Sequence, residues 1–164
     1  MIALVRVDNR LIHGQVVEAW LPDLKISRIL VADDSAAGSA LTRAAMGLAV
    51  PQAVKVEIAP LSSADFAGAA ASPERVLVLL RDVAAALRAR ELGLPIDALN
   101  LGNIHFAPGR VQVNASVYLS PAELVALRAL AASGAAVEVR AVPKEKPLGL
   151  AEVEARLAAA PPPG

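Results

Sequence analysis

The chain has 164 residues, of which 55% are hydrophobic and only 2% aromatic, and its 16 basic residues balance 16 acidic ones at a formal net charge of +0. This balance and the scarcity of aromatic rings argue against a nucleic-acid partner, which needs a cationic surface and stacking platforms. The absence of cysteine excludes disulfides, thiolate catalysis and Cys-based metal sites, and two histidines are too few for a His-rich site. We therefore expect neither a metal ion nor a cofactor.

The N-terminus carries no basic segment ahead of an apolar run, so the sequence predicts no signal peptide. No uninterrupted apolar stretch approaches the roughly 18 residues that cross a membrane. We therefore expect a cytoplasmic protein with a sizeable core. Because aromatic residues are scarce, Val and Ile in strands and Ala and Leu in helices must build that core.

The first element is a strand over residues 2–7, which ends at a turn formed by Asp8-Asn9. A helix begins near His13 and ends at Pro22, and Trp20 within it is expected to pack in the core. Along the rest of the chain, short apolar runs alternate with helical patterns. Strands are predicted over residues 26–32, 54–58, 75–80, 96–101 and 136–142. Helices are predicted over residues 36–49, 62–70, 83–92, 121–133 and 148–158.

The helix over 36–49 is expected to have Leu41, Ala45, Met46 and Leu48 on its apolar side. Asp33 and Asp34 stand directly before it and can cap its first turn. Two adjacent carboxylates could also indicate a metal site, but no further acidic residues accompany them. Capping is therefore the preferred interpretation.

Strands that alternate with helices predict an α/β fold, a doubly wound, mainly parallel sheet with helices on both faces. We expect a single domain over residues 1–158 and a disordered tail over residues 159–164. The doubly wound order places the first strand beside the strand over 75–80. The loops after these two strands and after the strand over 96–101 should then meet at one edge of the sheet, where open α/β sheets bind ligands.

The loop between the first strand and the first helix places His13 among charged residues. An imidazole is a nucleophile near neutral pH, and a phosphoryl group bound to it carries about two negative charges. Arg6 and Arg10 could pair with those charges through forked hydrogen bonds, while Asp8 orients the ring or an arginine. Gly14 would let an anion approach the backbone. On these residues alone, an ordinary surface histidine among solvated charges stays an equal alternative.

The same loop carries a family resemblance. It reads Arg6-Val-Asp-Asn-Arg10-Leu-Ile-His13-Gly-Gln15-Val. This run resembles R-[IV]-D-[DN]-R-L-[IL]-H-G-Q-V, which stands near the N-terminus of the enzyme IIB subunits of the mannose/fructose/sorbose class of the bacterial phosphoenolpyruvate-dependent sugar phosphotransferase system. Later segments are similar to that family's in order and spacing, namely residues 31–34, 74–80, 100–103 and 137–143. The resemblance covers roughly residues 1–155.

The resemblance implies a phosphocarrier on which His13 accepts a phosphoryl group from a phosphohistidine of the IIA protein and passes it to a sugar of the mannose class. The membrane subunits IIC and IID hold that sugar, so the family's IIB subunits work at the inner face of the membrane. Arg10 and Arg6 are the implied phosphate clamps, and the family's fold adds an antiparallel edge strand to the sheet. Supporting roles are implied for Asp8, Gly14, Gln15, Arg81, Asn100 and Gly102.

Some assignments stay open in the sequence. Arg81 stands where the family can carry a smaller, hydroxyl-bearing residue, and it either extends the cationic pocket or pairs with Asp82. His105 either faces the site or packs structurally. The IIA interface is expected around the reactive histidine, with the apolar residues Leu11 and Ile12 beside it. The sequence indicates neither the sugar nor whether the chain forms a homo-oligomer.

Three other functions are alternatives to the phosphocarrier. A phosphohistidine phosphatase or mutase also uses a His-Gly pair after a strand, but its motif places Arg directly before the histidine and needs a second catalytic histidine. Ile12 stands before His13 in this chain. A nucleotide-binding domain would carry a Gly-rich phosphate loop, which the sequence lacks. A regulatory phosphohistidine acceptor that is not coupled to sugar transport would use the same loop, and that alternative stays open.

Overall fold

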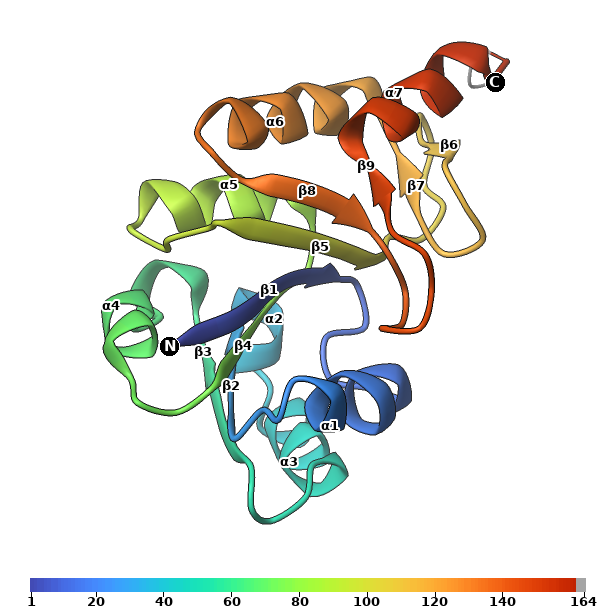
Figure 1. Ribbon diagram of the computed structural model, residues 1–164. Helices are drawn as coiled ribbons and strands as arrows, with labels where there is room; N and C mark the ends of the chain where they lie inside the picture. The colour runs from blue at the N-terminus through green and yellow to red at the C-terminus, as the bar shows by residue number, and fades with distance from the viewer. Residues whose placement is uncertain (162–164) are drawn as a thin grey trace.

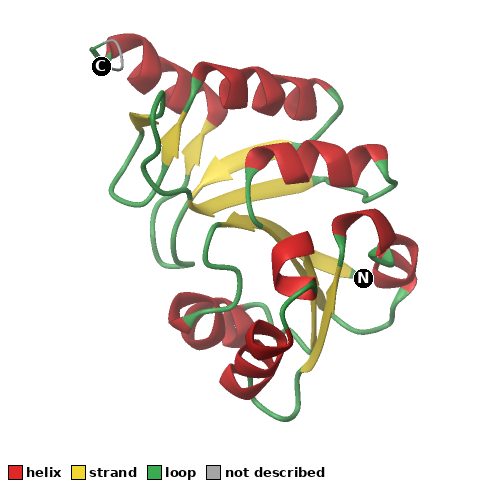
Figure 2. Cartoon of the chain, turned by 180° about the vertical axis from the view of Figure 1, so that it is seen from behind, coloured by secondary structure: helices red, strands yellow, loops and turns green. Residues whose placement is uncertain are grey.

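The computed structural model of the chain describes residues 1–161, and residues 162–164 lie outside the described part. Its centre is a seven-stranded sheet with helices on both faces (Figures 1 and 2). The strands lie side by side in the order β3 (Lys55–Ala59), β2 (Arg28–Ala32), β4 (Val76–Leu80), β1 (Ile2–Asp8), β5 (Ala98–Asn103), β8 (Ala136–Val139) and β9 (Leu148–Gly149). A separate antiparallel ribbon contains β6 (Val111–Gln112) and β7 (Tyr118–Leu119).

Helical segments connect the strands. They are the π-helix η1 (Val16–Trp20), α1 (Leu21–Asp23), α2 (Asp34–Ala37), α3 (Ala40–Ala49), the 3-10 helix η2 (Leu61–Ser63), α4 (Phe66–Ala71), α5 (Val83–Glu91), α6 (Pro121–Ala132) and α7 (Leu150–Ala159). Side chains that cap a helix N-terminus explain where five of these segments begin, because each accepts a hydrogen bond from a backbone N–H of the first turn. The capping residues are Asp33, Ser39, Asp65, Asp82 and Ser120.

The strand pairing confirms the expected doubly wound sheet. β1 pairs in parallel with β4 on one side and with β5 on the other, and β2 pairs in parallel with β3 and β4. β9 runs antiparallel to β8 at one edge, as the family resemblance implied. The elements that follow β1 and β4 lie on opposite faces of the sheet (Figure 2). The carboxyl ends of these neighbouring strands therefore form the switch point at which such sheets bind ligands.

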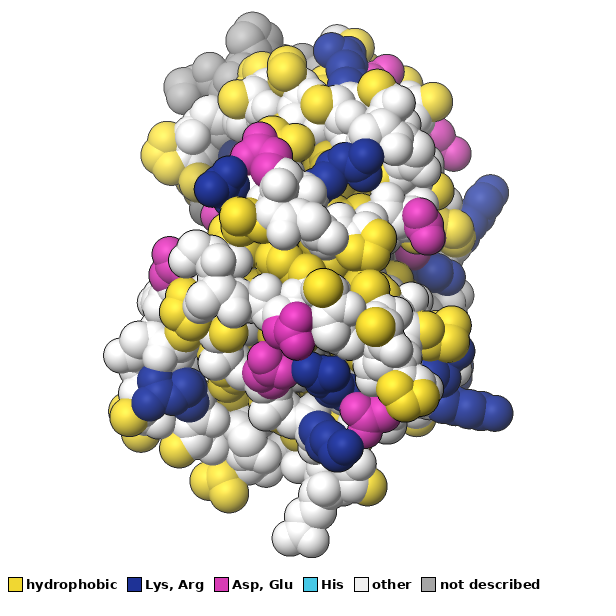
Figure 3. All heavy atoms as spheres, turned by 90° about the vertical axis from the view of Figure 1, so that its left-hand side faces the viewer, with side chains coloured by type: hydrophobic (Ala, Val, Ile, Leu, Met, Phe, Trp, Pro, Cys, Tyr) yellow, Lys and Arg dark blue, Asp and Glu magenta, His cyan; other side chains and the backbone are white. Residues whose placement is uncertain are grey.

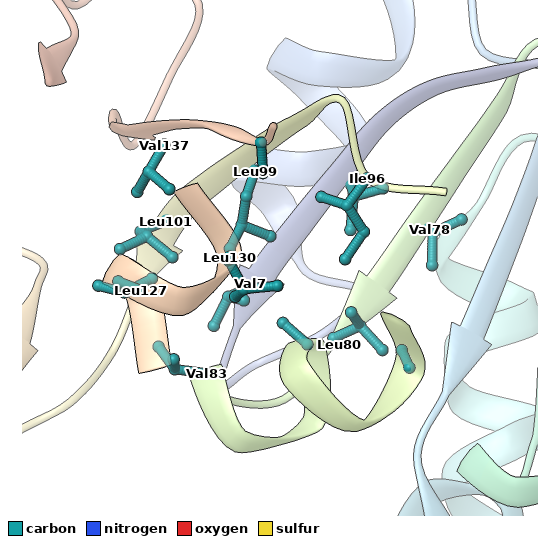
Figure 4. Packing of buried hydrophobic residues seen from close by; sticks show 14 of the residues in the cluster. Val7, Val78, Leu80, Val83, Ile96, Leu99, Leu101, Leu127, Leu130 and Val137 are labelled. Carbon is teal, nitrogen blue, oxygen red and sulfur yellow. The ribbon is translucent and has the colours of Figure 1, made fainter. Parts of the chain in front are cut away.

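One hydrophobic layer lies between the sheet and helices α4, α5, α6 and α7. In it, Val7, Leu80 and Leu101 of three different strands pack with Leu127 and Leu130 of α6 (Figure 4). All five side chains are fully buried, and burying a Val or Leu side chain contributes about 1.5–3 kcal/mol. This layer holds the strands that carry the site in one register.

The second layer covers the opposite face of the sheet and is formed by η1, α1, α2 and α3. Successive residues of a strand point to opposite faces, so Leu77 and Leu79 of β4 belong to this layer. Trp20 and Leu21 pack there as well, which confirms the expected core position of Trp20. The helix that follows the first loop is therefore attached to the sheet by its apolar side.

The helix expected over residues 36–49 is two helices, α2 and α3, separated by Gly38 and Ser39. The break occurs because the Ser39 hydroxyl accepts a hydrogen bond from the Thr42 backbone and starts a new helix. Of the residues expected on the apolar side, Met46 packs against the core, but the expectation is wrong for Leu41 and Leu48, whose side chains are 82% and 88% exposed. An apolar stripe on a helix shows only that one side is apolar, and among residues 1–161 nothing covers Leu41 or Leu48.

Further boundaries differ from the expectation. Pro22 does not end the first helix. It stands in the first turn of α1, directly after the π-helical turn, and the first turn of a helix tolerates a residue without a backbone N–H. Leu148 and Gly149, expected as the start of the last helix, form β9 instead. α7 extends to Ala159, so the first residue of the expected tail is helical, while residues 162–164 of that tail lie outside the described residues.

A cleft of about 400 Å³ opens at the edge of the sheet where the strands begin, lined by Ile2, Leu4, Pro95 and Asp97 among others. Figure 3 looks onto this side of the molecule, where apolar side chains line a hollow. None of the polar side chains that gather at the carboxyl edge lines this cleft. The cleft lies at the amino ends of the strands, at the opposite edge of the sheet from these polar side chains.

The difference in burial between Leu79 and Leu48 predicts very different costs for two leucine truncations. Leu79→Ala empties a fully buried position in β4 and should lower the free energy of unfolding by about 2–5 kcal/mol. Leu48→Ala removes an exposed side chain and should change it by less than about 0.5 kcal/mol. Urea unfolding of both variants measures the difference, and equal costs would contradict the placement of α3.

Candidate functional site

Three loops meet at the carboxyl edge of the sheet, and Asn9 connects them. Its backbone N–H donates to the carbonyl of Asn103 after β5 at 2.9 Å. Its side-chain amide donates to the carbonyl of Arg81 after β4 at 2.7 Å, and its side-chain oxygen accepts from the backbone N–H of His105 at 2.6 Å. These bonds confirm the expected convergence of the loops after β1, β4 and β5.

The loop after β1 turns sharply because Asp8 organises its backbone. The Asp8 carboxylate accepts from the Arg10 N–H at 2.9 Å, and the Asp8 carbonyl accepts from the Leu11 N–H at 3.0 Å. Leu11 adopts a positive φ of 56°, which is unfavourable for a branched side chain. Its side chain is fully buried, and this packing holds the strained turn. His13 follows and its carbonyl accepts the first helical hydrogen bond, from Val17.

His13 lies buried against Asp8, with its ring Nε2 at 2.8 Å from Asp8 Oδ2. A carboxylate only accepts hydrogen bonds, so a neutral His13 ring donates from Nε2 and keeps the lone pair on Nδ1. His13 Nδ1 is itself buried and has no hydrogen-bond partner among the described residues. A buried polar atom without a partner is uncommon in a folded protein, and at a strand's carboxyl edge it indicates a site for chemistry.

The Asp8 carboxylate is saturated with donors. Besides His13, its Oδ2 accepts from Arg6 Nε and Nη2 at 3.1 and 3.0 Å and from Asn103 Nδ2 at 2.9 Å. Burial by itself raises the pKa of the Asp8 carboxyl, but the His13 hydrogen bond, the Arg6 charge and the Asn103 amide outweigh it and lower that pKa. Asp8 is therefore a fixed anion that orients the His13 ring.

Arg6 is completely buried, and its donors face the protein. In addition to Asp8, its Nη1 donates to Asn100 Oδ1 at 2.6 Å and to the Arg140 carbonyl at 3.2 Å. Its guanidinium lies 5.2 Å from the centre of the Trp20 ring, a favourable cation–π distance. A β-carbon at position 102 would overlap this guanidinium, so Gly102 is needed for the arginine to fit.

The two arginines of the motif therefore occupy different environments. The expectation that Arg6 clamps a phosphoryl group does not fit its position, because the guanidinium is enclosed and bound to Asp8. Arg10, four residues later, has an exposed side chain. Gly14 is exposed too, and a β-carbon built on it would meet nothing within 4 Å, so there is open space beside the loop. Gln15 faces the site and accepts from the Asn103 amide at 3.0 Å.

Arg81 forms an ion pair with Asp33. Its guanidinium donates two hydrogen bonds to Asp33, at 2.8 and 2.7 Å, and one to the Asn9 carbonyl at 3.2 Å. Asp82 instead caps α5, so the Arg81–Asp82 pair, one of the two alternatives left by the sequence, does not form. The hydrogen bond with Asp33 raises the pKa of Arg81. Arg81 thus ties the end of β2 to the first loop.

Leu11 and Ile12 cannot form the expected docking surface, because both side chains are buried in the layer beneath the loop. A carboxylate at position 11 would be placed in the core, so Leu11→Asp should unfold the chain rather than only weaken docking. His105, in contrast, has an exposed side chain and contributes its backbone N–H to Asn9. Its side chain therefore does not serve as core packing.

Asn103 and the indole N–H of Trp20 have partners that were not predicted from the sequence. Asn103 donates to both Asp8 and Gln15, and it stands in the same segment as Asn100 and Gly102, so its position at a strand end was a usable signal. The Trp20 indole N–H donates to the Ala141 carbonyl at 2.9 Å. No local pattern could have indicated that partner, because it lies far along the chain.

Two features are absent from the described part of the chain. Among residues 1–161, no three His, Cys, Asp or Glu side chains are grouped so that they could hold a metal ion. Within the same range, every helix is too short or too polar to cross a bilayer.

Known protein families provide a further comparison. The family model described as "PTS system sorbose subfamily IIB component" matches residues 2–159. The chain is 29% identical to the mannose-specific EIIAB component of Escherichia coli strain K12, over 96% of this chain and 49% of that protein. It thus spans about half the length of this relative. It is also 30% identical to the sorbose-specific EIIB component of Klebsiella pneumoniae, over 86% of this chain and 87% of that protein.

Solved structures share the fold. The IIB domain of the sorbose permease from Klebsiella pneumoniae superposes with a TM-score of 0.85 at 28% identity, covering 94% of this chain and 97% of that one. The N-acetylgalactosamine-specific IIB component 1 from Escherichia coli superposes with a TM-score of 0.83 at 26% identity, covering 90% of this chain and 97% of that one.

The contrast between the two arginines can be measured. Arg6→Ala leaves Asp8 as an unpaired buried anion and should lower the free energy of unfolding by about 3–5 kcal/mol. Arg10→Ala removes an exposed side chain and should change it by less than about 0.5 kcal/mol. Urea unfolding at neutral pH compares the two, and similar stabilities for both variants would contradict the buried position of Arg6.

The stability should also depend on pH in the acid range. The pKa values of Asp8 and Asp33 are both lowered in the folded chain, Asp33 mainly because the Arg81 hydrogen bonds outweigh burial. Near the ordinary carboxyl pKa of about 3.9, the unfolded chain therefore binds more protons than the folded chain. The free energy of unfolding then falls as the pH drops from that value toward the lower pKa values of Asp8 and Asp33 in the folded chain. Urea unfolding between about pH 6 and pH 2.5 should show this fall, and Asp8→Asn should make it shallower. An unchanged slope in Asp8→Asn would contradict the assignment.

Proposed function

Because the chain belongs to the sorbose-subfamily IIB components of the bacterial sugar phosphotransferase system, we propose that it carries a phosphoryl group on His13 during sugar uptake. The observation that carries this proposal is the state of the His13 ring. One nitrogen is held by the buried Asp8 carboxylate, and the other has no partner among the described residues. A neutral imidazole in this arrangement presents a single nucleophilic atom, Nδ1.

In the proposed transfer, the lone pair of His13 Nδ1 attacks the phosphorus of a phosphohistidine on the donor. The Nδ1–P bond forms while the donor's N–P bond breaks, and the donor imidazole leaves with the bonding electron pair. Asp8 stays bound to Nε2–H and stabilises the positive charge that develops on the ring. In the second step a sugar hydroxyl oxygen attacks the phosphorus, the Nδ1–P bond breaks, and the hydroxyl proton is released.

His13 Nδ1 is covered in this conformation. The groups that cover Nδ1 must therefore move aside when a donor approaches, while the Nε2–Asp8 hydrogen bond is kept, and the space beside Gly14 is open. Arg10, exposed on the same loop, can then pair with the phosphoryl oxygens through forked hydrogen bonds. The backbone N–H groups at the start of the helix add donors.

Arg6 has a supporting role in this proposal rather than the clamp role that the family motif implied. It fixes Asp8, and Asp8 fixes the His13 ring. Three residues of β5 support this arrangement without contacting the ring. The Asn100 and Asn103 side chains hydrogen-bond to Arg6 and Asp8, respectively, and Gly102 leaves room for the Arg6 guanidinium. A mutation of these groups would act on the ring through its orientation.

The proposed partners follow from the relatives. The mannose-specific relative is an EIIAB component about twice as long as the segment that matches this chain. We infer a IIA protein or domain as the phosphoryl donor and the membrane subunits IIC and IID as the route to a hexose, which would hold the chain at the inner face of the membrane. The similar proteins are named for mannose, N-acetylgalactosamine and sorbose, so the sugar itself is left to experiment.

Transfer from a phosphorylated IIA protein tests the proposal directly. The wild-type chain should gain one phosphoryl group, detected by mass spectrometry at neutral to alkaline pH because phosphohistidine is acid-labile. His13→Ala should gain none. Arg10→Ala should be phosphorylated on the order of 10-fold to 100-fold more slowly, because it removes a cation that meets the transferring group.

Arg88→Ala is the matched control, since it removes an exposed arginine from α5, away from the loops that meet at His13. The proposal is contradicted if the wild-type chain stays unmodified in the presence of an active donor. It is also contradicted if His13→Ala still gains the phosphoryl group. Equal slowing by Arg88→Ala would remove the special role of Arg10.

A further inference from the structure

Phe106 is an exposed aromatic residue in a chain with few aromatic residues. The sequence has two Phe, one Tyr and one Trp. Trp20 and Phe66 are buried, whereas Phe106 is 69% exposed. Its ring stands edge-on against Tyr118, with ring centres 5.9 Å apart. Single exposed apolar residues are common on protein surfaces. The exposure of Phe106 therefore indicates a binding surface only if the residue lies beside a functional site.

That position is beside the reactive loop. The segment over residues 104–110 follows β5 directly, and its His105 N–H donates to Asn9 on the loop that carries His13. Arg110 fixes the segment, because it donates to the His105 carbonyl at 2.8 Å and to the Glu123 carboxylate at 2.8 Å. Phe106 is therefore held on a braced loop, not on a mobile tip, next to the chemistry.

The exposed charge on the neighbouring loop is a cation. Arg10 is exposed one residue after Asn9, while the carboxylates of Asp8 and Asp33 are buried and paired with arginines. A partner that approaches this side therefore meets a free cation and an aromatic ring. Arginine and large aromatic residues are the residue types that most often dominate the energy of protein interfaces.

We propose that Phe106 is the apolar anchor of the surface that docks the phosphorylated IIA donor, with Arg10 meeting the charge of the incoming phosphoryl group. This inference rests on the function proposed above. Charge complementarity favours the donor over the membrane acceptor. Arg10 is free when His13 is bare, which is the state that meets the donor. Once His13 is phosphorylated, the bound phosphoryl group neutralises that cation before the acceptor docks.

The test compares a large donor with a small one. Phe106→Ala should lower kcat/KM for transfer from a phospho-IIA protein by about tenfold or more, mainly through KM for the donor. Phosphoramidate, which is too small to need docking, should phosphorylate His13 in Phe106→Ala at the wild-type rate. Leu48→Ala, the control, removes an exposed side chain on the opposite face of the sheet and should change neither rate. Phe106→Leu should recover part of the loss.

Each other outcome has a distinct meaning. Wild-type transfer from phospho-IIA to Phe106→Ala would overturn the docking surface, and a defect limited to the step toward the membrane subunits would assign it to the acceptor instead. Phosphorylation of His13 by phosphoramidate but by no IIA protein would overturn the docking inference and leave the acceptor chemistry standing. Failure of both donors on the wild-type chain would overturn the proposed function itself.

Discussion

A buried ion pair between Arg6 and Asp8 is the interaction on which the candidate site depends. Both side chains are fully enclosed, and buried charges are tolerated only when an opposite charge and further hydrogen bonds surround them. Here Asn100 and the Arg140 carbonyl accept from Arg6, and Asn103 donates to Asp8. These groups come from β1, from β5 and from the end of β8. The site can therefore form only when those strands lie together.

The pair also separates the tasks of two arginines that stand four residues apart. Arg6 belongs to the strand and points into the closed space in which it holds Asp8, and Asp8 in turn holds Nε2 of His13. Arg10 lies beyond the turn and is exposed. In the proposed transfer, one cation orients the reactive ring from inside the fold while the other stays free for the phosphoryl group and for the approaching donor.

Periodicity in the sequence predicts much of this fold. The uninterrupted apolar run in β4 indicates a central strand, and all five of its residues are buried between β1 and β2. The strict alternation over residues 54–58 indicates an edge strand, and β3 lies at the edge. The same reasoning fails for α3, whose exposed Leu41 and Leu48 have the spacing of a buried stripe. Periodicity shows that one side of a helix is apolar, but the rest of the chain decides whether that side is covered.

By itself, the sequence determined the order of the elements, the caps that start the helices and the loop that brings Asp8, Arg10 and His13 together. These features depend on interactions between residues a few positions apart. Only the tertiary structure decided that Arg6 is buried and that Arg81 pairs with Asp33 rather than with its neighbour Asp82. Such partners lie tens of residues apart, and strand order and burial bring them together, which the packing of the whole chain sets.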